Sequence, residues 1–134
     1  MTHVLYCDGA SRGNPGAASY GFVLLDGAGR VVAERGEEVG VNTNNVAEYR
    51  GLVAGLEAAL AAGVRELEVR LDSLLLVRQV SGEYRVKAPG LKPLHRRAVG
   101  LLGQIGAARV KHIPREQNSR ADALANAALD RRAP

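Results

Sequence analysis

The chain has 134 residues, of which 46% are hydrophobic and 24% are charged, and we expect one globular domain over residues 1–134. The single cysteine, Cys7, excludes an internal disulfide, and no apolar run approaches the roughly 18 residues that a membrane helix needs. We therefore expect a cytoplasmic protein without a membrane segment. We also expect a monomer, because no pattern indicates an obligate protein partner.

The charges are unevenly distributed along the chain. The net charge is +4, yet residues 1–84 carry a net charge of −4 and residues 85–134 carry +8. A basic half suits a polyanion such as a nucleic acid, since phosphate contacts release condensed counterions. A solvated basic face is the alternative, and charge alone does not decide between the two.

The hydrophobic periodicity predicts three strands, a helix, a strand, two helices, a strand and a last helix. The expected strands cover 3–8, 17–25, 30–41, 66–71 and 109–113, and the expected helices cover 45–62, 73–81, 93–104 and 118–131. The composition of 26–29 predicts a hairpin turn, and Gly63 is placed for a left-handed C-cap. This order predicts an α/β fold whose mixed five-stranded sheet is covered by helices.

Four carboxylates lie at the ends of these elements. Asp8 and Asp72 are expected to end the first and fourth strands, and Glu48 and Asp122 fall in the first turns of helices. Strand ends and adjoining helix starts form the crevice in which ligands bind in open α/β sheets. Carboxylates gathered there repel one another, and divalent cations relieve that repulsion.

Oxygen-only ligands favour Mg²⁺ or Mn²⁺ over zinc, so the sequence predicts a site for one of these ions. The alternative for the two helical acids is structural. Both have capping-box spacing from an Asn or Ser, and an acid in a first turn complements the helix dipole.

Four local strings extend this argument: DGASRGNPG at 8–16, TNNVAE at 43–48, LDS at 71–73, and HIPREQN leading to AD at 112–122. These strings resemble the four sequence blocks of type 1 ribonuclease H and occur in the same order as in that family. The resemblance covers nearly the whole chain. It implies the ribonuclease H-like fold, with an antiparallel three-strand meander, two parallel strands, and helices on both faces. It also implies an endonuclease that cuts the RNA strand of an RNA–DNA hybrid and leaves 5′-phosphate and 3′-hydroxyl ends.

The resemblance implies a role for each acid. Asp8 would bridge two Mg²⁺ ions, for which Mn²⁺ is a substitute. Asp122 would complete the first ion site, which activates the attacking water, and Glu48 and Asp72 would complete the second, which stabilises the departing 3′ oxygen. His112 would help to protonate the leaving group or ease product departure. The alternative for His112 is a strand-end ring that merely hydrogen-bonds a neighbour.

Contacts with the hybrid also follow from the resemblance. The glycine-rich segment would let the backbone approach the RNA strand, the asparagines would reach 2′-hydroxyls and base edges in the minor groove, and the threonine would hold a DNA phosphate. The residues concerned are Gly9, Ser11, Arg12, Asn14, Thr43, Asn44 and Asn45. A plain turn at Asn14 and a plain N-cap at Asn45 are the alternatives.

The chain departs from the family pattern in two places. Leu74 stands where many relatives carry a polar residue that reaches the groove. Only about 36 residues separate Asp72 from the expected last strand, which leaves no room for the basic handle helix that some members use to hold substrate. A basic surface would replace that helix, made of Arg85, Lys87, Lys92, Arg96 and Arg97.

Two other functions remain as alternatives. Another nuclease of the same fold, such as a junction resolvase, would lack the block at 43–48. A non-catalytic hybrid-binding module would have no use for four acids in these positions, so their presence argues against it.

Overall fold

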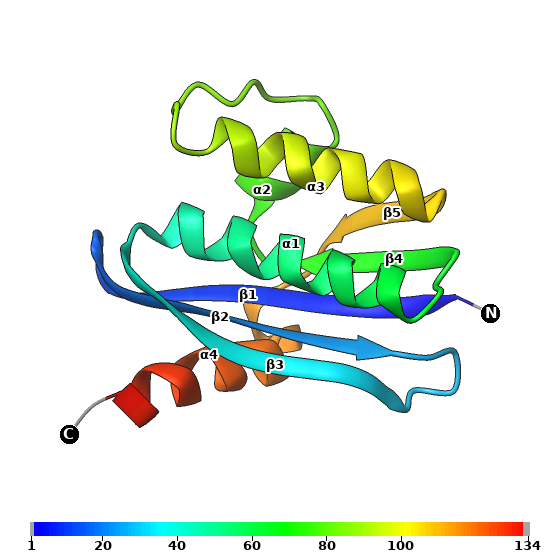
Figure 1. Ribbon diagram of the computed structural model, residues 1–134, viewed down its shortest axis with the longest axis horizontal. Helices are drawn as coiled ribbons and strands as arrows, with labels where there is room; N and C mark the ends of the chain where they lie inside the picture. Colours follow the sequence, from blue (N-terminus) through cyan, green and yellow to red (C-terminus); the bar gives the residue numbers. More distant parts are fainter. Residues whose placement is uncertain (1, 133–134) are drawn as a thin grey trace.

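Five strands form one mixed sheet in the order β3-β2-β1-β4-β5 in the computed structural model, which describes residues 2–132 (Figure 1). The strands are β1 (His3–Gly13), β2 (Gly16–Leu25), β3 (Val31–Asn42), β4 (Glu66–Leu71) and β5 (Ala107–His112). Antiparallel pairing joins β1, β2 and β3, and parallel pairing joins β4 to β1 and β5 to β4. The predicted meander with two parallel strands is confirmed.

Helices cover both faces of the sheet, as predicted (Figure 1). They are α1 (Asn44–Ala61), α2 (Leu74–Val80), α3 (Lys92–Ile105) and α4 (Ser119–Arg132), with a short 3-10 turn at Arg115–Gln117. α1 lies on one face of the sheet, with α3 beside it toward β5, whereas α4 packs on the opposite face against β2 and β3. Within residues 2–132, no helix combines the length and apolarity that crossing a bilayer demands.

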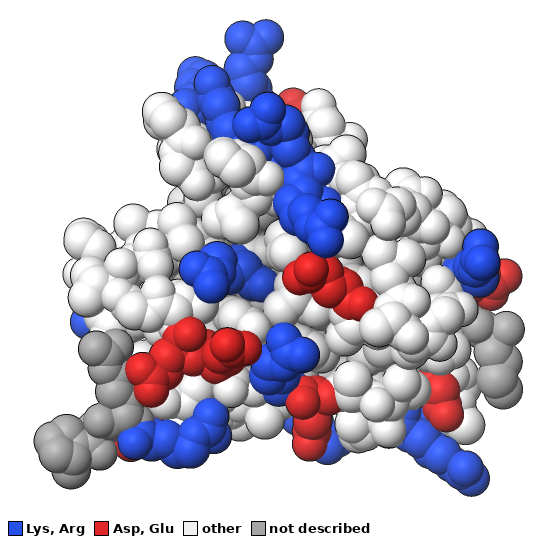
Figure 2. Space-filling view, viewed as in Figure 1, with Lys and Arg blue, Asp and Glu red and all other residues white. Residues whose placement is uncertain are grey.

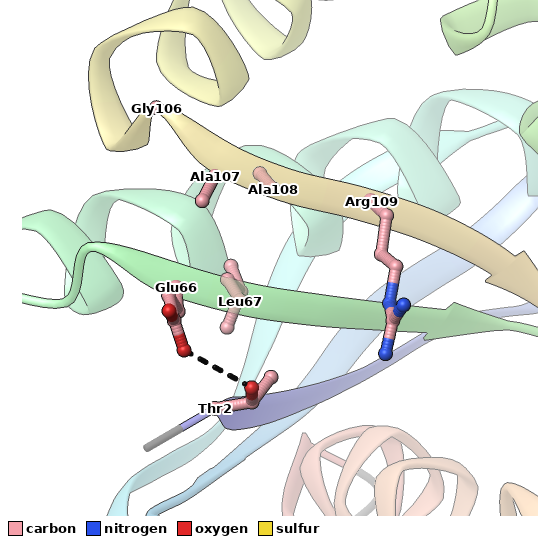
Figure 3. A pocket seen from close by; sticks show the side chains of 7 residues that line it. All are labelled: Thr2, Glu66, Leu67, Gly106, Ala107, Ala108 and Arg109. Atoms are coloured by element: carbon pink, nitrogen blue, oxygen red, sulfur yellow. Dashed lines mark hydrogen bonds between the residues drawn. The ribbon is translucent and has the colours of Figure 1, made fainter.

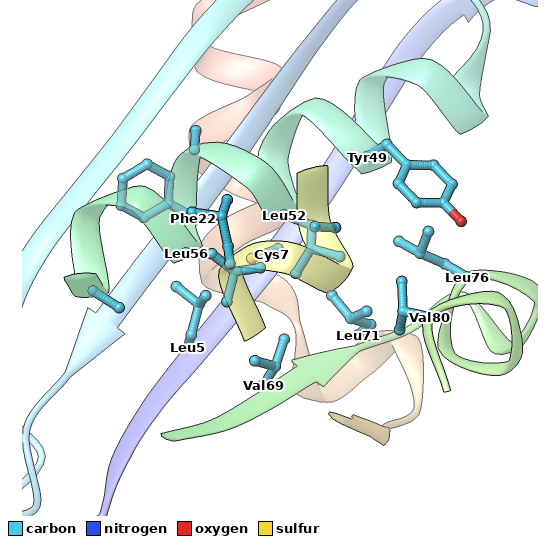
Figure 4. Close-up of a cluster of buried hydrophobic side chains, with 14 of the residues drawn as sticks. Leu5, Cys7, Phe22, Tyr49, Leu52, Leu56, Val69, Leu71, Leu76 and Val80 are labelled. Carbon is cyan, nitrogen blue, oxygen red and sulfur yellow. The ribbon is translucent and has the colours of Figure 1, made fainter. Parts of the chain in front are cut away.

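The main core lies between α1 and the sheet (Figure 4). Leu5, Leu24, Leu52, Leu56 and Val69 are completely buried there. Burying each such side chain contributes about 1.5–3 kcal/mol, so this layer is the main source of stability. Cys7 belongs to the same layer, and burial raises the pKa of its thiol.

The first strand is longer than the sequence predicted, and the expectation that Asp8 ends it is wrong. Residues 9–12 pair with residues 17–20 of β2, so the glycine-rich segment is mostly strand and its turn is confined to 14–15. The reason is that β2 begins at Gly16 and offers partners up to the tip of the hairpin. Pairing of β1 with β4 stops at Tyr6, so Asp8 still lies where these two strands separate.

Helix α1 begins one residue earlier than predicted. Its N-cap is Thr43, whose hydroxyl accepts a hydrogen bond from the main-chain N–H of Val46 at 3.2 Å. The alternative in which Asn45 caps the helix is therefore wrong. Glu48 lies beyond the first turn, where neither a capping box nor the helix dipole accounts for a half-buried acid. At the other end, Gly63 adopts φ 77° as predicted.

Gly9 lets α1 approach β1 at the level of Glu48. A Cβ at Gly9 would lie 2.5 Å from the main-chain nitrogen of Glu48 and 2.7 Å from the main-chain carbon of Ala47. We expect Gly9→Ala to lower the free energy of unfolding by about 1–3 kcal/mol, because only a backbone shift could relieve this overlap. Urea denaturation measures the change.

Gly100→Ala is the matched control. Gly100 lies inside α3, where an added Cβ would meet nothing within 4 Å. Alanine favours a helix over glycine by up to about 1 kcal/mol, so this variant should be no less stable than the parent. Equal effects of the two substitutions would show that Gly9 has no special contact.

Candidate active site

The four predicted acids come from four elements that meet at one end of the sheet. Asp8 lies in β1 beyond its pairing with β4, and Asp72 directly follows β4. Glu48 comes from α1 on one face of the sheet, and Asp122 lies in the first turn of α4 on the other face, as predicted. The electrostatic influence of Asp72 reaches both Asp8 and Glu48, so the structure brings these acids together.

Asp8 is the most buried of the four, with 9% of its surface exposed. Burial is the main reason that its pKa rises to about 8, and the charge of Asp72 and a hydrogen bond to Asp122 raise it further. The main-chain N–H of Gly9 donates to Asp8 Oδ1 at 2.9 Å and lowers the pKa in part. Asp8 therefore holds a proton near neutral pH unless a cation replaces it.

Glu48 is in a similar position. Burial, followed by the charge of Asp72, raises its pKa to about 7. A hydrogen bond from Ser73 and the charge of Arg115 lower the pKa in part. Neither Ser73 nor Arg115 was predicted from the sequence as a neighbour of Glu48, although both lie inside the strings that carry the resemblance. Ser73 also caps α2, where its hydroxyl accepts from Leu76 N at 3.2 Å.

Asn118 is a third residue of the site that was not predicted from the sequence. Its side-chain amide donates to the main-chain carbonyl of Cys7 at 2.8 Å and to Oδ2 of Asp72 at 3.1 Å. Its main-chain carbonyl accepts from the N–H of Asp122 at 3.1 Å. The residue thus lies between β1, the end of β4 and the start of α4.

The donor chemistry of this cluster fits hard divalent cations, since all four side chains offer oxygen. The protonation that burial and repulsion force on Asp8 and Glu48 is what a cation would relieve. Across residues 2–132, no three acidic, histidine or cysteine side chains are close enough to hold an ion in their present positions. A cation would therefore draw the carboxylates closer together than they lie here.

His112 ends β5, as predicted, beside Asp72. Its Nε2 lies 3.3 Å from the main-chain carbonyl oxygen of Asp72, and its ring is exposed. Because a carbonyl only accepts, Nε2 carries the proton in this contact. His112 thus hydrogen-bonds a neighbouring residue, as expected if its role is only structural. It also lies next to the acids, as expected if it takes part in the reaction, so its position fits both interpretations.

The predicted hybrid contacts divide into two groups. Asn14, at the tip of the β1–β2 hairpin, accepts from the main-chain N–H of Asn44 at 3.1 Å, next to Thr43 and Asn45 at the start of α1. These four residues lie together. The others act within the protein: Ser11 donates to the Gly13 carbonyl, Arg12 pairs with Asp130, and Gly9 packs against α1.

Basic side chains gather over α3 and the loop before it, whereas acidic side chains lie mostly over other parts of the same face (Figure 2). A hollow of about 680 Å³ lies between that loop and the start of α3, and Arg85, Lys92 and Arg96 are in its lining. Three of the five residues of the predicted basic surface therefore line one hollow, whereas Arg97 pairs with Glu57 of α1 at 3.1 Å. Leu74, the departure from the family pattern, is 43% exposed at the start of α2.

A second hollow, of about 320 Å³, lies at the opposite end of the sheet (Figure 3). Its lining includes Thr2, Glu66 and Ala107, at the amino ends of β1, β4 and β5, and Thr2 donates to Glu66 at 3.2 Å. Ligands of open α/β sheets bind outside the carboxyl ends of the strands. The acid cluster lies at that end, and this hollow does not.

Comparison with known proteins settles the family. A family model described as reverse transcriptase-like matches residues 6–128. Ribonuclease H1 of Halobacterium salinarum has a TM-score of 0.93 and 46% identity, covering 98% of this chain and 99% of that one. The chain belongs to the type 1 ribonuclease H family.

Two further solved ribonuclease H structures are similarly close to this chain. The N-terminal ribonuclease H domain of a Mycobacterium tuberculosis protein has a TM-score of 0.94 and 45% identity, covering 98% of this chain and 95% of that one. LC11-RNase H1, solved in complex with an RNA/DNA hybrid, has a TM-score of 0.90 and 41% identity, covering 96% of this chain and 97% of that one. The chain spans 63% of the Halobacterium ribonuclease HI sequence and 36% of the bifunctional Mycobacterium protein.

The acid cluster predicts how stability depends on pH when metal is absent. Folding raises the pKa of Asp8 to about 8 and that of Glu48 to about 7, so the folded state favours their protonated forms. This contribution is complete below the unfolded values of about 4 and is lost as the pH rises through about 7 to 8. We expect the melting temperature in chelator to fall over this range.

Thermal melts of two variants check the origin of that fall. Asp8→Asn should flatten the dependence, because the amide does not titrate. Glu116→Gln, which changes an exposed acid of the 3-10 turn, should leave it unchanged. A parent protein whose melting temperature is constant between about pH 5 and pH 9 would contradict the prediction.

Proposed function

We propose that the chain is a metal-dependent endonuclease that hydrolyses the RNA strand of RNA–DNA hybrids and leaves 5′-phosphate and 3′-hydroxyl ends. The observation that carries the proposal is the meeting of Asp8, Glu48, Asp72 and Asp122 at the carboxyl end of the sheet, from four different elements. The names of relatives support it, since the Halobacterium protein is a ribonuclease HI. The hybrid bound to LC11-RNase H1 supports the substrate.

The four carboxylates would hold two Mg²⁺ ions, for which Mn²⁺ would substitute, with Asp8 shared between them. These ions, when bound, supply positive charge at the attacking and departing oxygens of the phosphodiester. The protein would contribute the placement of the ligands and the exclusion of water from Asp8. Because the neighbours of the carboxylates are mostly neutral donors such as Gly9 N–H and Asn118, the negative charge that Asp8 and Glu48 gain on losing their protons would be left for the ions.

The hybrid would lie across the hairpin tip and the start of α1. Asn14, Asn44 and Asn45 are grouped there and offer amides suited to 2′-hydroxyls and base edges of the minor groove. Thr43 would meet a DNA phosphate, although its hydroxyl oxygen also caps α1. The basic hollow beside α3 would attract backbone phosphates of the same duplex, in place of a handle helix.

A set of matched duplexes tests the proposal. With Mg²⁺, the RNA strand of a hybrid should be cut internally, and the DNA strand and a pure DNA duplex should stay intact, because 2′-hydroxyl contacts select the RNA strand. With chelator in place of Mg²⁺, cleavage should stop. Cleavage of pure DNA at a comparable rate would overturn the proposal, and gel analysis of end-labelled strands reads out both products.

Asp8→Asn should abolish cleavage in the same assay. An amide cannot neutralise two cations, whereas the fold and the hybrid-binding surface around Asn14 and Asn44 should persist. Hybrid binding measured by fluorescence anisotropy should therefore remain within about threefold of the parent value. Mg²⁺-dependent cleavage by this variant at a substantial rate would remove Asp8 from the metal site.

His112→Ala separates the two readings of the histidine. If His112 moves a proton or helps product to leave, turnover should fall roughly ten- to a hundredfold while hybrid affinity hardly changes. If the ring only contacts the Asp72 carbonyl, turnover should stay within about twofold. Because the ring is exposed, the melting temperature should be nearly constant in either case. We expect the larger effect, measured as steady-state turnover at saturating hybrid.

A further inference from the structure

Asn118 connects three of the four elements that carry the acids. Its Nδ2 donates to the carbonyl of Cys7, the residue before Asp8, and to Oδ2 of Asp72, at 2.8 and 3.1 Å. Its main-chain carbonyl accepts from the N–H of Asp122. The contacts with Cys7 and Asp72 use both amide protons, so the donor capacity of the side chain is fully engaged.

The acceptor of the same amide is unused. Asn118 is 1% exposed, and its Oδ1 accepts no hydrogen bond from any group of residues 2–132. The amide cannot be turned over, because Oδ1 would then face two acceptors, the Cys7 carbonyl and the Asp72 carboxylate. A buried acceptor without a partner is costly, and native proteins keep one where a water, an ion or a function accounts for it.

Packing alone does not explain this residue. An apolar side chain of similar size would fill the space without burying an unpaired acceptor. A lysine or arginine would satisfy Asp72 more strongly, but its charge would compete with a cation for the carboxylate. A neutral amide restrains the direction of the Asp72 carboxylate and leaves its charge available.

We propose that Asn118 is a positioning residue of the metal site. It holds the Asp72 carboxylate against β1, next to Asp8, in an orientation suited to a divalent cation, and its free Oδ1 accepts a hydrogen bond from water in the loaded site. The proposal rests on the proposed function. Removing a group that orients a metal ligand in this way typically lowers metal affinity ten- to a hundredfold.

Asn118→Ala tests the proposal, with Asn126→Ala as its matched control. Asn126 lies in α4, which Asn118 directly precedes, and donates its amide to the main-chain carbonyl of Asp122 at 3.0 Å. Mg²⁺ affinity without substrate is measured by titration calorimetry and by the rise in melting temperature with Mg²⁺. We expect affinity to fall about tenfold or more in Asn118→Ala and to be unchanged in Asn126→Ala.

The Mg²⁺ dependence of cleavage gives an independent readout. The Mg²⁺ concentration for half-maximal rate should rise in Asn118→Ala, excess Mg²⁺ should restore most of kcat, and KM for the hybrid should stay constant. A double-mutant cycle on Mg²⁺ affinity combines Asn118→Ala with Asp72→Asn. Because Asn118 acts through Asp72, removing Asn118 should cause little further loss of Mg²⁺ affinity in that background.

Two outcomes would overturn the inference. Unchanged Mg²⁺ affinity in Asn118→Ala, with a melting temperature lowered equally with and without Mg²⁺, would make the residue purely structural. If Asn118→Ala lowered Mg²⁺ affinity equally with and without Asp72→Asn, Asn118 would not act through Asp72. If Asn118→Ala does not fold, Asn118→Ser replaces it with the same expectations, since one hydroxyl proton can serve at most one of the two acceptors. A parent protein without Mg²⁺-dependent cleavage would refute the proposed function, whereas a Mg²⁺-dependent parent with unchanged Asn118→Ala refutes this inference alone.

Discussion

Asp8 and Asp72 repel each other at the point where β1 and β4 separate, and most features of the site answer that repulsion. Burial is the larger cause: it raises the pKa of Asp8 to about 8 and that of Glu48 to about 7, and the charge of Asp72 raises both further. The groups that restrain the acids are mainly uncharged donors: Gly9 N–H, Ser73 and Asn118. The protein thus fixes the carboxylates in place while leaving their charge to be neutralised by something from outside.

Main-chain contacts set the distance between the acid-bearing elements. Gly9 brings β1 against the backbone of α1 at Glu48. On the other face, a Cβ at Gly21 would lie 2.2 Å from the carbonyl oxygen of Ala121, and one at Gly36 would lie 2.2 Å from that of Leu124. Since backbone is stiffer than side chains, these contacts place the acids more firmly than side-chain packing alone would.

Much of this could be predicted from the sequence, because it depends on local signals. The order of elements, the hairpin turn at 26–29 and the end of β5 to within one residue follow from periodicity and turn composition. The extension of β1 past Asp8 could not, since residues 9–12 have the composition of a turn and become strand only by pairing with β2. Thr43 and Asn45 are both good caps, and where β3 ends decides between them.

The role of Asn118 lies further from what sequence can show. Its amide contacts Cys7, which is 111 positions away in the chain, and Asp72, which is 46 positions away. Nothing local in 112–122 distinguishes this asparagine from an ordinary residue before a helix. Contacts of this kind depend on the assembled sheet, and the unpaired Oδ1 becomes visible only there.

The contacts of α4 with Gly21 and Gly36 also bear on how this fold can vary. Asp122 and Ala121 are neighbours in α4, so any side chain that β2 acquired at Gly21 would push against the turn that carries the acid. A side chain at either glycine, Gly21 or Gly36, would therefore displace the backbone of α4. Substitutions at Gly21 or Gly36 would therefore move α4, and Asp122 with it, and so change the spacing of the carboxylates without altering any of the four acids.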